Sequence, residues 1–300
     1  MKGLKLICWS LLLSGFLLSC ENARGDYPDK EKNKKEKNKK GKANEVEAAS
    51  AAIEVVKKWE MPAILLEISG LSYMGKDQFA CIQDEAGVIF IYNTSTGKID
   101  SSITFGAAGD YEGIALVNKT AYVVRSDGKI FEVNNIDTTS PHIREYQTSL
   151  TAHNNVEGLT YDSKHNRLLL AIKGAETSAS DYKGIYAFDL NTKKLAVEPL
   201  FKLSLTDPAL AGTKSKKLNN ALQPSEIAVN PITGDIYLTE AVNPQLFILD
   251  ATGKIKARHK LNGNVFTQPE GLAFSPDGEL YISNEGKKGS GNILKVQIAH

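Results

Sequence analysis

Short apolar runs separated by Gly, Asn, Asp and Pro recur along the chain from residue 51 onwards. Long stretches with the period of a helix are absent from this part of the sequence. Apolar runs of strand length, bounded by turn-forming residues, are typical of β-structure. The pattern therefore predicts an all-β domain over residues 51–300.

One phrase, an apolar run that begins beside a single polar residue, occurs five times, at Ile68–Tyr73, Tyr111–Val117, Val156–Asp162, Pro224–Asn230 and Pro269–Ser275. The copies are roughly 45 residues apart, except for one interval of about 68 residues, and such a period with four short strands per unit is typical of β-propeller blades. We therefore predict a β-propeller of five four-stranded blades.

The remaining strands of each blade follow its first, inner strand. Second strands are expected at Gln78–Gln83, Thr120–Arg125, Arg167–Ile172, Asp235–Glu240 and Glu279–Asn284. Third strands are expected at Val88–Tyr92, Lys129–Val133, Gly184–Leu190, Gln245–Asp250 and Asn292–Gln297. Fourth strands are expected at Lys98–Phe105, His142–Leu150, Pro199–Leu205 and Lys254–Leu261.

The fifth unit lacks a fourth strand of its own, and the apolar run Ala52–Met61 precedes the first unit. We predict that this run completes the last blade and closes the ring, which removes an exposed sheet edge. An open solenoid of five units is the alternative. The long interval contains an insertion at residues 207–222, expected to be an extended loop or short helix, and six blades remain possible if it hides an irregular sheet.

The N-terminus resembles a bacterial lipoprotein signal. Lys2 and Lys5 precede the apolar run Leu6–Leu18, which ends just before Cys20 and is shorter than the roughly 20 residues of a membrane-spanning helix. The resemblance implies a signal peptide over residues 1–19, a lipid on Cys20 and anchoring to a bacterial membrane in the cell envelope, facing the periplasm or the surface. A plain secretory signal is the alternative.

Residues 20–50 contain the repeat "KEKNKKEKNKK" (Lys30–Lys40), which has no apolar residue. Such a segment cannot bury enough surface to offset the entropy of ordering, so we expect a disordered tether. It is expected to act as a spacer, and electrostatic contact with anionic headgroups or cell-wall polymers is the alternative.

Composition narrows the class of protein further. The chain is 42% hydrophobic with a net charge of +1, so it lacks the basic surplus of a nucleic-acid-binding domain. The three cysteines have no spacing typical of a zinc site or a disulfide framework. Cys81 lies in an apolar run and is expected to be an inert buried thiol. We expect a monomer.

The phrases "EISGLSY", "DYEGIALV", "QPSEIAVNPITGDIYLTEA" and "QPEGLAFSPDGELYISNEG" together resemble the SdiA-regulated family of bacterial β-propeller proteins. The resemblance extends over about residues 62–297. It implies the propeller fold and membership of the family, and it does not imply a defined activity.

The polar position at the start of each inner strand holds Ser69, Glu112, Glu157, Ser225 and Glu270. Inner strands surround the central channel of a propeller, and second strands end on the face where inner strands begin. These five residues should therefore gather at one channel mouth. The strand-end residues expected beside them are Gln83, Asp84, Arg125, Lys173, Glu240, Asn284 and Glu285.

Three glutamates around one channel repel each other, by roughly 4 kcal/mol for two charges about 4 Å apart at an effective dielectric of about 20. One solution is bound Ca²⁺ with Glu112, Glu157 and Glu270 as ligands, assisted by Asn284. A second is pairing with Arg125 and Lys173. A third is hydrogen bonding to backbone N–H groups at the blade junctions. All three remain open, and Glu226, at the Gly position of the fourth copy, is expected to point elsewhere.

No catalytic motif stands out, and the histidines show no paired metal-ligand spacing; only His153 lies close to a site residue in sequence. The sequence therefore leaves enzymatic activity undecided. The first hypothesis is a tethered module that binds a small ligand, glycan or protein at the mouth, with Ca²⁺. The alternatives are a metal-dependent hydrolase of the phosphoesterase or lactonase type and a structural envelope protein.

Overall fold

The computed structural model describes residues 53–75, 77–138, 140–213, 215–287 and 289–299. The predicted signal peptide, the predicted lipidation site Cys20 and the predicted tether at residues 20–50 lie outside the described residues. Within these ranges, no helix has the length and apolar character needed to cross a membrane.

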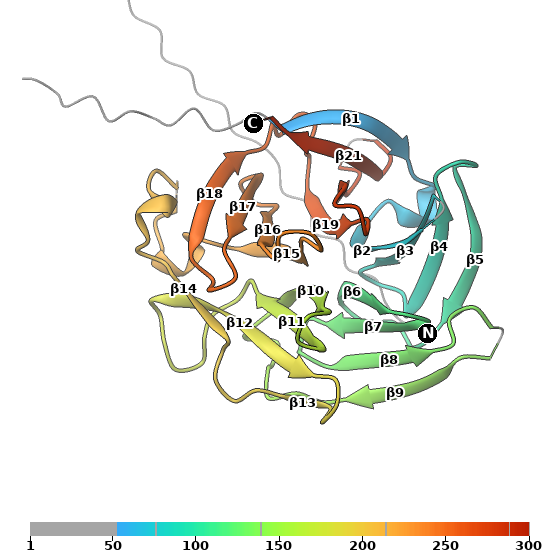
Figure 1. Cartoon of the computed structure of the whole chain (residues 1–300), viewed down its shortest axis with the longest axis horizontal. Helices are drawn as coiled ribbons and strands as arrows, with labels where there is room; N and C mark the ends of the chain where they lie inside the picture. The colour runs from blue at the N-terminus through green and yellow to red at the C-terminus, as the bar shows by residue number, and fades with distance from the viewer. Residues whose placement is uncertain (1–52, 76, 139, 214, 288, 300) are drawn as a thin grey trace, which may run out of the picture. The chain divides into compact units, whose positions relative to one another are not determined.

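Five antiparallel sheets surround a central axis (Figure 1). Their innermost strands are β2 (Ile68–Gly75), β6 (Tyr111–Val117), β10 (Val156–Asp162), β15 (Pro224–Val229) and β19 (Pro269–Phe274). All five repeated phrases are therefore inner strands, and the predicted all-β propeller is confirmed.

The other strands follow outwards in chain order. Second strands are β3 (Gln78–Gln83), β7 (Thr120–Arg125), β11 (Arg167–Ile172), β16 (Ile236–Glu240) and β20 (Leu280–Asn284). Third strands are β4 (Val88–Asn93), β8 (Ile130–Asn134), β12 (Tyr182–Asp189), β17 (Gln245–Leu249) and β21 (Asn292–Ile298). Fourth strands of blades 1, 2 and 4 are β5 (Lys98–Thr104), β9 (His142–Tyr146) and β18 (Ile255–Lys260).

The ring is closed by β1 (Ile53–Glu60), which pairs with β21 in blade 5 (Figure 1). The pairing is antiparallel and runs from Ile53 opposite Ile298 to Glu60 opposite Asn292. A short 3₁₀ helix, η1 (Ala63–Leu65), then leads into β2 of blade 1. The predicted closure by an N-terminal strand is confirmed, and the solenoid alternative is wrong.

Blade 3 departs from the simple pattern. Its outer edge is divided between β13 (Lys194–Leu195) and β14 (Phe201–Ser204), which both pair with β12. The insertion that follows contains two 3₁₀ helices, η2 (Pro208–Leu210) and η3 (Leu218–Asn220). It adds no further sheet among the described residues, so five blades are confirmed and the six-blade alternative is wrong.

The insertion is held to the ring by its own apolar residues and by Arg258. Leu210 and Leu222 are buried in the core between blades 3 and 4. The Arg258 guanidinium donates hydrogen bonds to the carbonyls of Ala209 and Ala211, at 3.0 and 2.9 Å. The insertion is therefore a largely exposed loop that is anchored beside blade 4 by buried leucines and by backbone hydrogen bonds.

Apolar side chains fill the spaces between neighbouring blades. Between blades 1 and 2, for example, Ile82, Ile114 and Phe131 are buried in one cluster. Each such side chain contributes about 1.5–3 kcal/mol through the hydrophobic effect. Cys81 is fully buried, and burial raises the pKa of its thiol, which confirms the predicted inert cysteine.

Candidate functional site

A β-bulge opens every inner strand. In all five blades, the register between the inner and second strands shifts by one residue at the start of the inner strand. The extra, unpaired residues are Ser69, Glu112, Glu157, Ser225 and Glu270. Because a bulge redirects one side chain out of the alternating pattern, the repeated polar residue has a structural cause that is common to all copies.

The two serines at bulge positions tie neighbouring blades together. The Ser69 hydroxyl donates to the carbonyl of Tyr111 at 2.7 Å, and the Ser225 hydroxyl donates to that of Pro269 at 2.6 Å. Both serines are buried. The serines thus bond backbone carbonyls at the blade junctions, a different contact from the backbone N–H bonds considered for the glutamates.

The three glutamates at bulge positions form one electrostatic group with Lys173, and we call this set the mouth cluster. Glu157 and Glu270 are only 4% and 6% exposed. The Lys173 ammonium donates to the Glu157 carboxylate at 2.9 Å, and the Asn155 amide donates to its other oxygen at 2.6 Å. The predicted pairing with Lys173 is confirmed for Glu157.

Burial and mutual repulsion raise the pKa of these carboxyl groups. Burial, followed by the charges of Glu157 and Asp110, raises the pKa of Glu112 to about 9. Burial and the charge of Glu157 raise the pKa of Glu270 to about 8. Burial also raises the pKa of Glu157, although Lys173 opposes that rise. One lysine is too little positive charge for three ionised glutamates.

Glu226 adds a fourth carboxyl group beside the mouth cluster. It is completely buried, and one of its oxygens accepts hydrogen bonds from the backbone N–H groups of Leu159 and Ile227 at 2.7 and 2.8 Å. Its other oxygen has no hydrogen-bond partner in the described structure. Burial raises its pKa well above the ordinary value, and the nearby charges of Glu270 and Glu112 raise it further.

Asp84 and Glu285 lie in a second acidic group at the ends of β3 and β20. Burial and the charge of Asp84 raise the pKa of Glu285 to about 7. Burial and the charges of Glu67 and Glu85 raise the pKa of Asp84. The Gln268 amide donates to the Glu285 carboxylate. These two predicted residues therefore do lie together.

Arg125 does not neutralise the mouth cluster. Its guanidinium makes two hydrogen bonds with Asp127, at 3.0 and 2.6 Å, in the turn after β7. A carboxylate two residues away matches the planar fork of arginine, so this local pair outcompetes the glutamates. The prediction that Arg125 pairs with the mouth glutamates is therefore wrong.

Glu240 and Asn284 are completely buried and have local partners. The Glu240 carboxylate accepts from the amides of Asn243 and Gln245 at 3.0 and 2.8 Å. The Asn284 amide donates to Asn292 at 3.1 Å, while its own oxygen has no described partner. His153 is exposed on the surface, so its closeness to Glu157 in sequence gives it no buried role.

Lys183 holds the backbone next to the mouth cluster in place, and the sequence analysis did not predict this role. Its buried ammonium donates to the backbone carbonyl of Lys173 at 2.6 Å and to that of Gly174. Burial lowers the pKa of Lys183 to about 8, although Glu176 and Glu240 oppose the change. Its place at the start of a third strand gave no sign of this contact.

The described glutamates do not form a preformed metal-binding site. Among the described residues, no three His, Cys, Asp or Glu side chains are arranged to hold a metal ion as they stand. A cation at the mouth cluster would require side chains to close around it. As described, the cluster can hold protons or attract a positively charged group.

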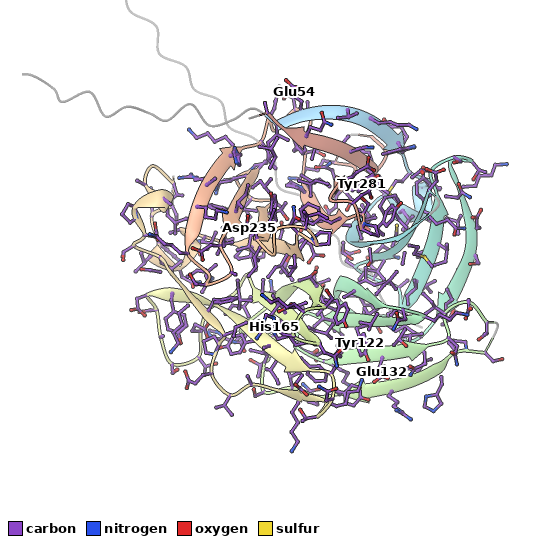
Figure 2. The ribbon with its side chains drawn as sticks, in the orientation of Figure 1. Glu54, Tyr122, Glu132, His165, Asp235 and Tyr281 are labelled. Atoms are coloured by element: carbon purple, nitrogen blue, oxygen red, sulfur yellow. The ribbon has the colours of Figure 1, made fainter. Side chains whose placement is uncertain are left out.

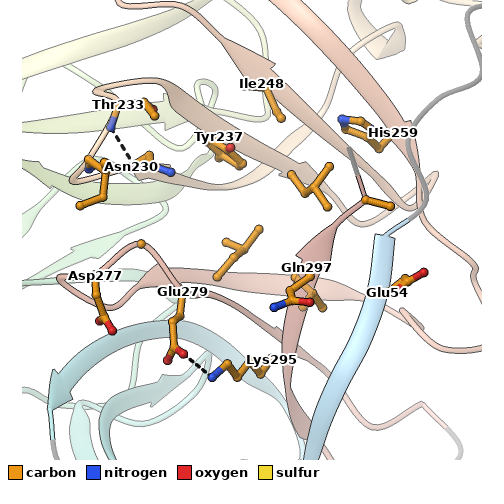
Figure 3. Close-up of a pocket in the computed structure, with 16 residues that line it drawn as sticks. Glu54, Asn230, Thr233, Tyr237, Ile248, His259, Asp277, Glu279, Lys295 and Gln297 are labelled. Carbon is orange, nitrogen blue, oxygen red and sulfur yellow. Dashed lines mark hydrogen bonds and ion pairs between the residues drawn. The ribbon is translucent and has the colours of Figure 1, made fainter.

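Two hollows lie elsewhere on the ring. One, of about 950 Å³, lies between blades 4 and 5 and is lined by Tyr237, Ile248, His259 and Leu280, among others (Figure 3). A hollow of about 290 Å³ is lined by the far ends of the inner strands, including Tyr161 and Phe274. The channel is therefore acidic at one end and more apolar at the other.

Comparison with known families agrees with this architecture. The family model described as SdiA-regulated matches residues 49–285, which include all five bulges. The chain belongs to the SdiA-regulated family. The resemblance carried by the repeated phrases is thereby confirmed. No match to this SdiA-regulated protein was found among curated proteins.

Solved structures similar to this SdiA-regulated protein share its fold. Glutaminyl cyclase of Myxococcus xanthus has a TM-score of 0.57 at 14% identity, covering 82% of this chain and 95% of that chain. PQQ-bound aldose sugar dehydrogenase of Streptomyces coelicolor has a TM-score of 0.50 at 13% identity, covering 83% and 98%. A luciferin-regenerating enzyme has a TM-score of 0.51 at 11% identity, covering 82% and 95%.

Proposed function

We propose that this SdiA-regulated protein is an extracytoplasmic binding module, tethered to a bacterial membrane through Cys20, whose channel mouth binds Ca²⁺. The observation that carries the proposal is the charge balance of the mouth cluster. Glu112, Glu157 and Glu270 have one lysine between them, and Glu226 adds another carboxyl group beside them. A small ligand, glycan or protein would then bind at the mouth beside the ion.

A hard divalent cation suits this group of oxygens. Carboxylate and amide oxygens are the ligands that Ca²⁺ prefers, and its coordination geometry is flexible. The unpaired oxygens of Glu226 and Asn284 supply acceptors that lack a partner in the described structure. Since the carboxyl groups hold protons because of burial and repulsion, binding would replace protons with the ion.

The test is thermal unfolding of the protein at pH 8, with Ca²⁺ and then with EDTA. An ion at 100 times its dissociation constant adds about 2.7 kcal/mol to the free energy of unfolding. We expect a higher midpoint with Ca²⁺, and we expect Glu112→Gln to remove most of the difference. Glu198→Gln is the matched control, because Glu198 is an exposed glutamate on blade 3.

Equal midpoints in Ca²⁺ and EDTA for the unmodified protein would overturn the calcium proposal. If Ca²⁺ raises the unfolding midpoint equally in Glu112→Gln and Glu198→Gln, the ion binds away from the mouth cluster. Circular dichroism of each variant is the control, because it shows whether the propeller has folded.

A metal-dependent hydrolase is the second candidate, favoured by one observation. Glu270, with its pKa near 8, is matched to proton transfer close to neutral pH. The glutaminyl cyclase and the dehydrogenase named above are enzymes on a similar fold. Hydrolysis of p-nitrophenyl phosphate or of a simple lactone, dependent on a divalent metal and lost in Glu270→Gln, would support this candidate; inactivity with Ca²⁺, Mg²⁺ and Mn²⁺ would exclude these substrates.

A further inference from the structure

An aromatic cavity lies where blade 5 meets blade 1, and we call it the closure pocket. It has a volume of about 180 Å³. Its aromatic walls are Trp59 from β1, Tyr73 from β2, Phe79 from β3 and Tyr281 from β20. Tyr281, labelled in Figure 2, lies in blade 5 on the side towards blade 1.

The rings form a continuous wall that does not close on itself. Tyr73 stacks on Tyr281 with centroids 5.8 Å apart and planes 21° from parallel. The Trp59 ring lies 6.2 Å from that of Tyr281, centroid to centroid, and is tilted by 36°. Phe79 meets Tyr281 edge-on at 5.0 Å. All four rings line the same cavity.

Trp59 and Tyr73 are only partly buried, unlike the aromatic residues at the next junction. Between blades 1 and 2, Phe105, Tyr111 and Phe131 form edge-on contacts and are 4%, 1% and 3% exposed. Aromatic packing between blades therefore does not in itself require an open cavity. At the closure pocket, two large rings keep part of their surface open to solvent.

Polar groups of both signs surround these rings. The rim contains Lys57, Asp77, Thr94, Glu279 and Lys295. Lys295 is paired with Glu279 (Figure 3). Glu279 also accepts from the Tyr281 hydroxyl at 2.8 Å. The Lys57 ammonium lies 4.7 Å from the centre of the Trp59 ring, and Asp77 accepts from Ser95 at 2.7 Å. The rim thus offers donors and acceptors with little net charge.

We propose that the closure pocket binds a pyranose ring of a neutral carbohydrate. The C–H face of a sugar ring carries slight positive charge and packs against the negative face of an aromatic ring, while its hydroxyls need donors and acceptors at the edge. The closure pocket combines both features in a space of about one ring. The balanced rim charges favour a neutral sugar over an anionic one.

This site is separate from the mouth cluster. Tyr73 lies towards the end of β2, whereas the bulge residue Ser69 lies near its start. Trp59 and Tyr281 belong to the closing blade, and no residue of the mouth cluster lines the cavity. Sugar binding at the closure pocket therefore does not depend on Ca²⁺ at the mouth.

The test measures the fluorescence of Trp59, which lines the closure pocket. The chain has two tryptophans, so the full chain carrying Trp9→Phe leaves Trp59 as the single source of tryptophan emission. We would titrate it, in a detergent without a sugar headgroup, with cellohexaose, maltohexaose and a hexamer of N-acetylglucosamine, each to about 10 mM. We expect a saturable change in Trp59 emission with at least one of these sugars.

Two variants separate binding from folding. Tyr73→Leu keeps the apolar volume and removes the flat ring, and we expect it to weaken binding about tenfold. Asp77 has a positive φ of 63°, which asparagine also tolerates, so Asp77→Asn should preserve this turn. The change weakens the hydrogen bonds that residue 77 can accept from sugar hydroxyls. Tyr182→Leu is the matched control, because Tyr182 also has a lysine near its ring, Lys202 at 5.1 Å, on blade 3.

No saturable change with any of the three sugars would overturn the proposal, as would equal effects of Tyr73→Leu and Tyr182→Leu. Thermal unfolding of each variant checks that it is folded. Glu112→Gln should leave sugar binding intact, so failure of the calcium proposal and failure of this one are distinguishable.

Discussion

At the scale of single residues, the mouth glutamates couple the stability of the propeller to pH. A carboxyl group whose pKa is higher in the folded than in the unfolded state binds more protons when folded. The free energy of unfolding therefore falls as pH rises between the two pKa values. For Glu112 this window extends from 4.5 to about 9, and for Glu270 from 4.5 to about 8.

We predict that, in EDTA, the propeller becomes more stable when the pH is lowered from 8 to 6. Glu112→Gln should raise the free energy of unfolding at pH 8 by at least about 1.4 kcal/mol, the value of one pKa unit, and flatten the pH dependence. Urea unfolding at pH 6, 7 and 8 measures both effects, with Glu198→Gln as the control. Stability that rises with pH over this range would contradict the prediction.

Glu285, whose pKa is raised to about 7, changes the stability in the same direction within this window, whereas Asp127 and Lys183 act at its edges. The pKa of Asp127 is lowered by its hydrogen bonds with Arg125, so Asp127 loses its stabilising effect only as the pH falls below its ordinary pKa of 3.8. Lys183, with its pKa lowered to about 8, stabilises the unfolded state below its ordinary pKa of 10.5, and this penalty is lost from about pH 8 upwards. Below pH 8 its penalty is nearly constant, so it does not mask the glutamates.

Lys173 is the residue on which the ionised state of Glu157 depends. Lys173→Met leaves a buried carboxyl group without its cation, and we expect a loss of about 1–3 kcal/mol of stability in EDTA. Removing the positive charge should also increase the stabilisation by Ca²⁺. Lys202→Met is the control, because it breaks an exposed pair with Glu198 that contributes about 0–1 kcal/mol. Equal losses in the two variants would refute the role given to Lys173.

The sequence predicts which residues gather at the mouth better than how they pair. The repeated phrase identifies Glu112, Glu157 and Glu270, because one bulge per blade gives one polar residue per copy. Pairing depends on the side chains that fold beside each group. Arg125 finds a carboxylate in its own turn, and Lys183 reaches the carbonyl of Lys173 from another strand. Neither contact leaves a pattern in the sequence.

At the scale of the strand, the bulge and the glycine after it act together. A Cβ atom on Gly113 would lie 2.6 Å from the Cβ of Leu159, on the next inner strand, and one on Gly158 would lie 2.9 Å from the nitrogen of Ile227. Neighbouring inner strands therefore approach too closely for any side chain at these positions. The bulge places the carboxyl group, and the glycine allows the channel to be narrow.

We predict that Gly113→Ala lowers the free energy of unfolding by about 1–3 kcal/mol, the usual cost of overpacking a core. Gly263→Ala is the matched control, since no atom lies within 4 Å of a Cβ built at Gly263. Urea unfolding of both variants gives the comparison. A Gly113→Ala protein as stable as Gly263→Ala would show that the inner strands can move apart.

Strand positions could be predicted well because Gly, Asn, Asp and Pro residues identify the turns between the apolar runs. β3, β6, β7, β10 and β11 have the predicted bounds. The fourth strand of blade 3 was the weakest prediction, since Pro199–Leu205 holds only β14, and β13 lies earlier at Lys194–Leu195. A two-residue strand leaves too few positions for alternation to be recognised.

At the scale of the whole molecule, β1 holds the ring closed. Deleting residues 53–60 exposes the edge of β21 and removes Trp59 from the core between blades 5 and 1. We predict loss of cooperative thermal unfolding, followed by circular dichroism. Deletion of residues 21–46, which precede the compact unit beginning at Glu47, should leave the midpoint unchanged. A cooperative transition in the chain without residues 53–60 would contradict the closure argument.

The pairing of β1 with β21 also sets an order of events in time. β1 (Ile53–Glu60) is synthesised before blades 1 to 4, and its partner β21 (Asn292–Ile298) is synthesised after them. Contacts so distant in sequence form slowly, and until then both strands are open edges prone to pairing with other chains. A chain that ends before Asn292 lacks β21, so the ring stays open. Closure of the ring therefore waits until all five blades have been synthesised.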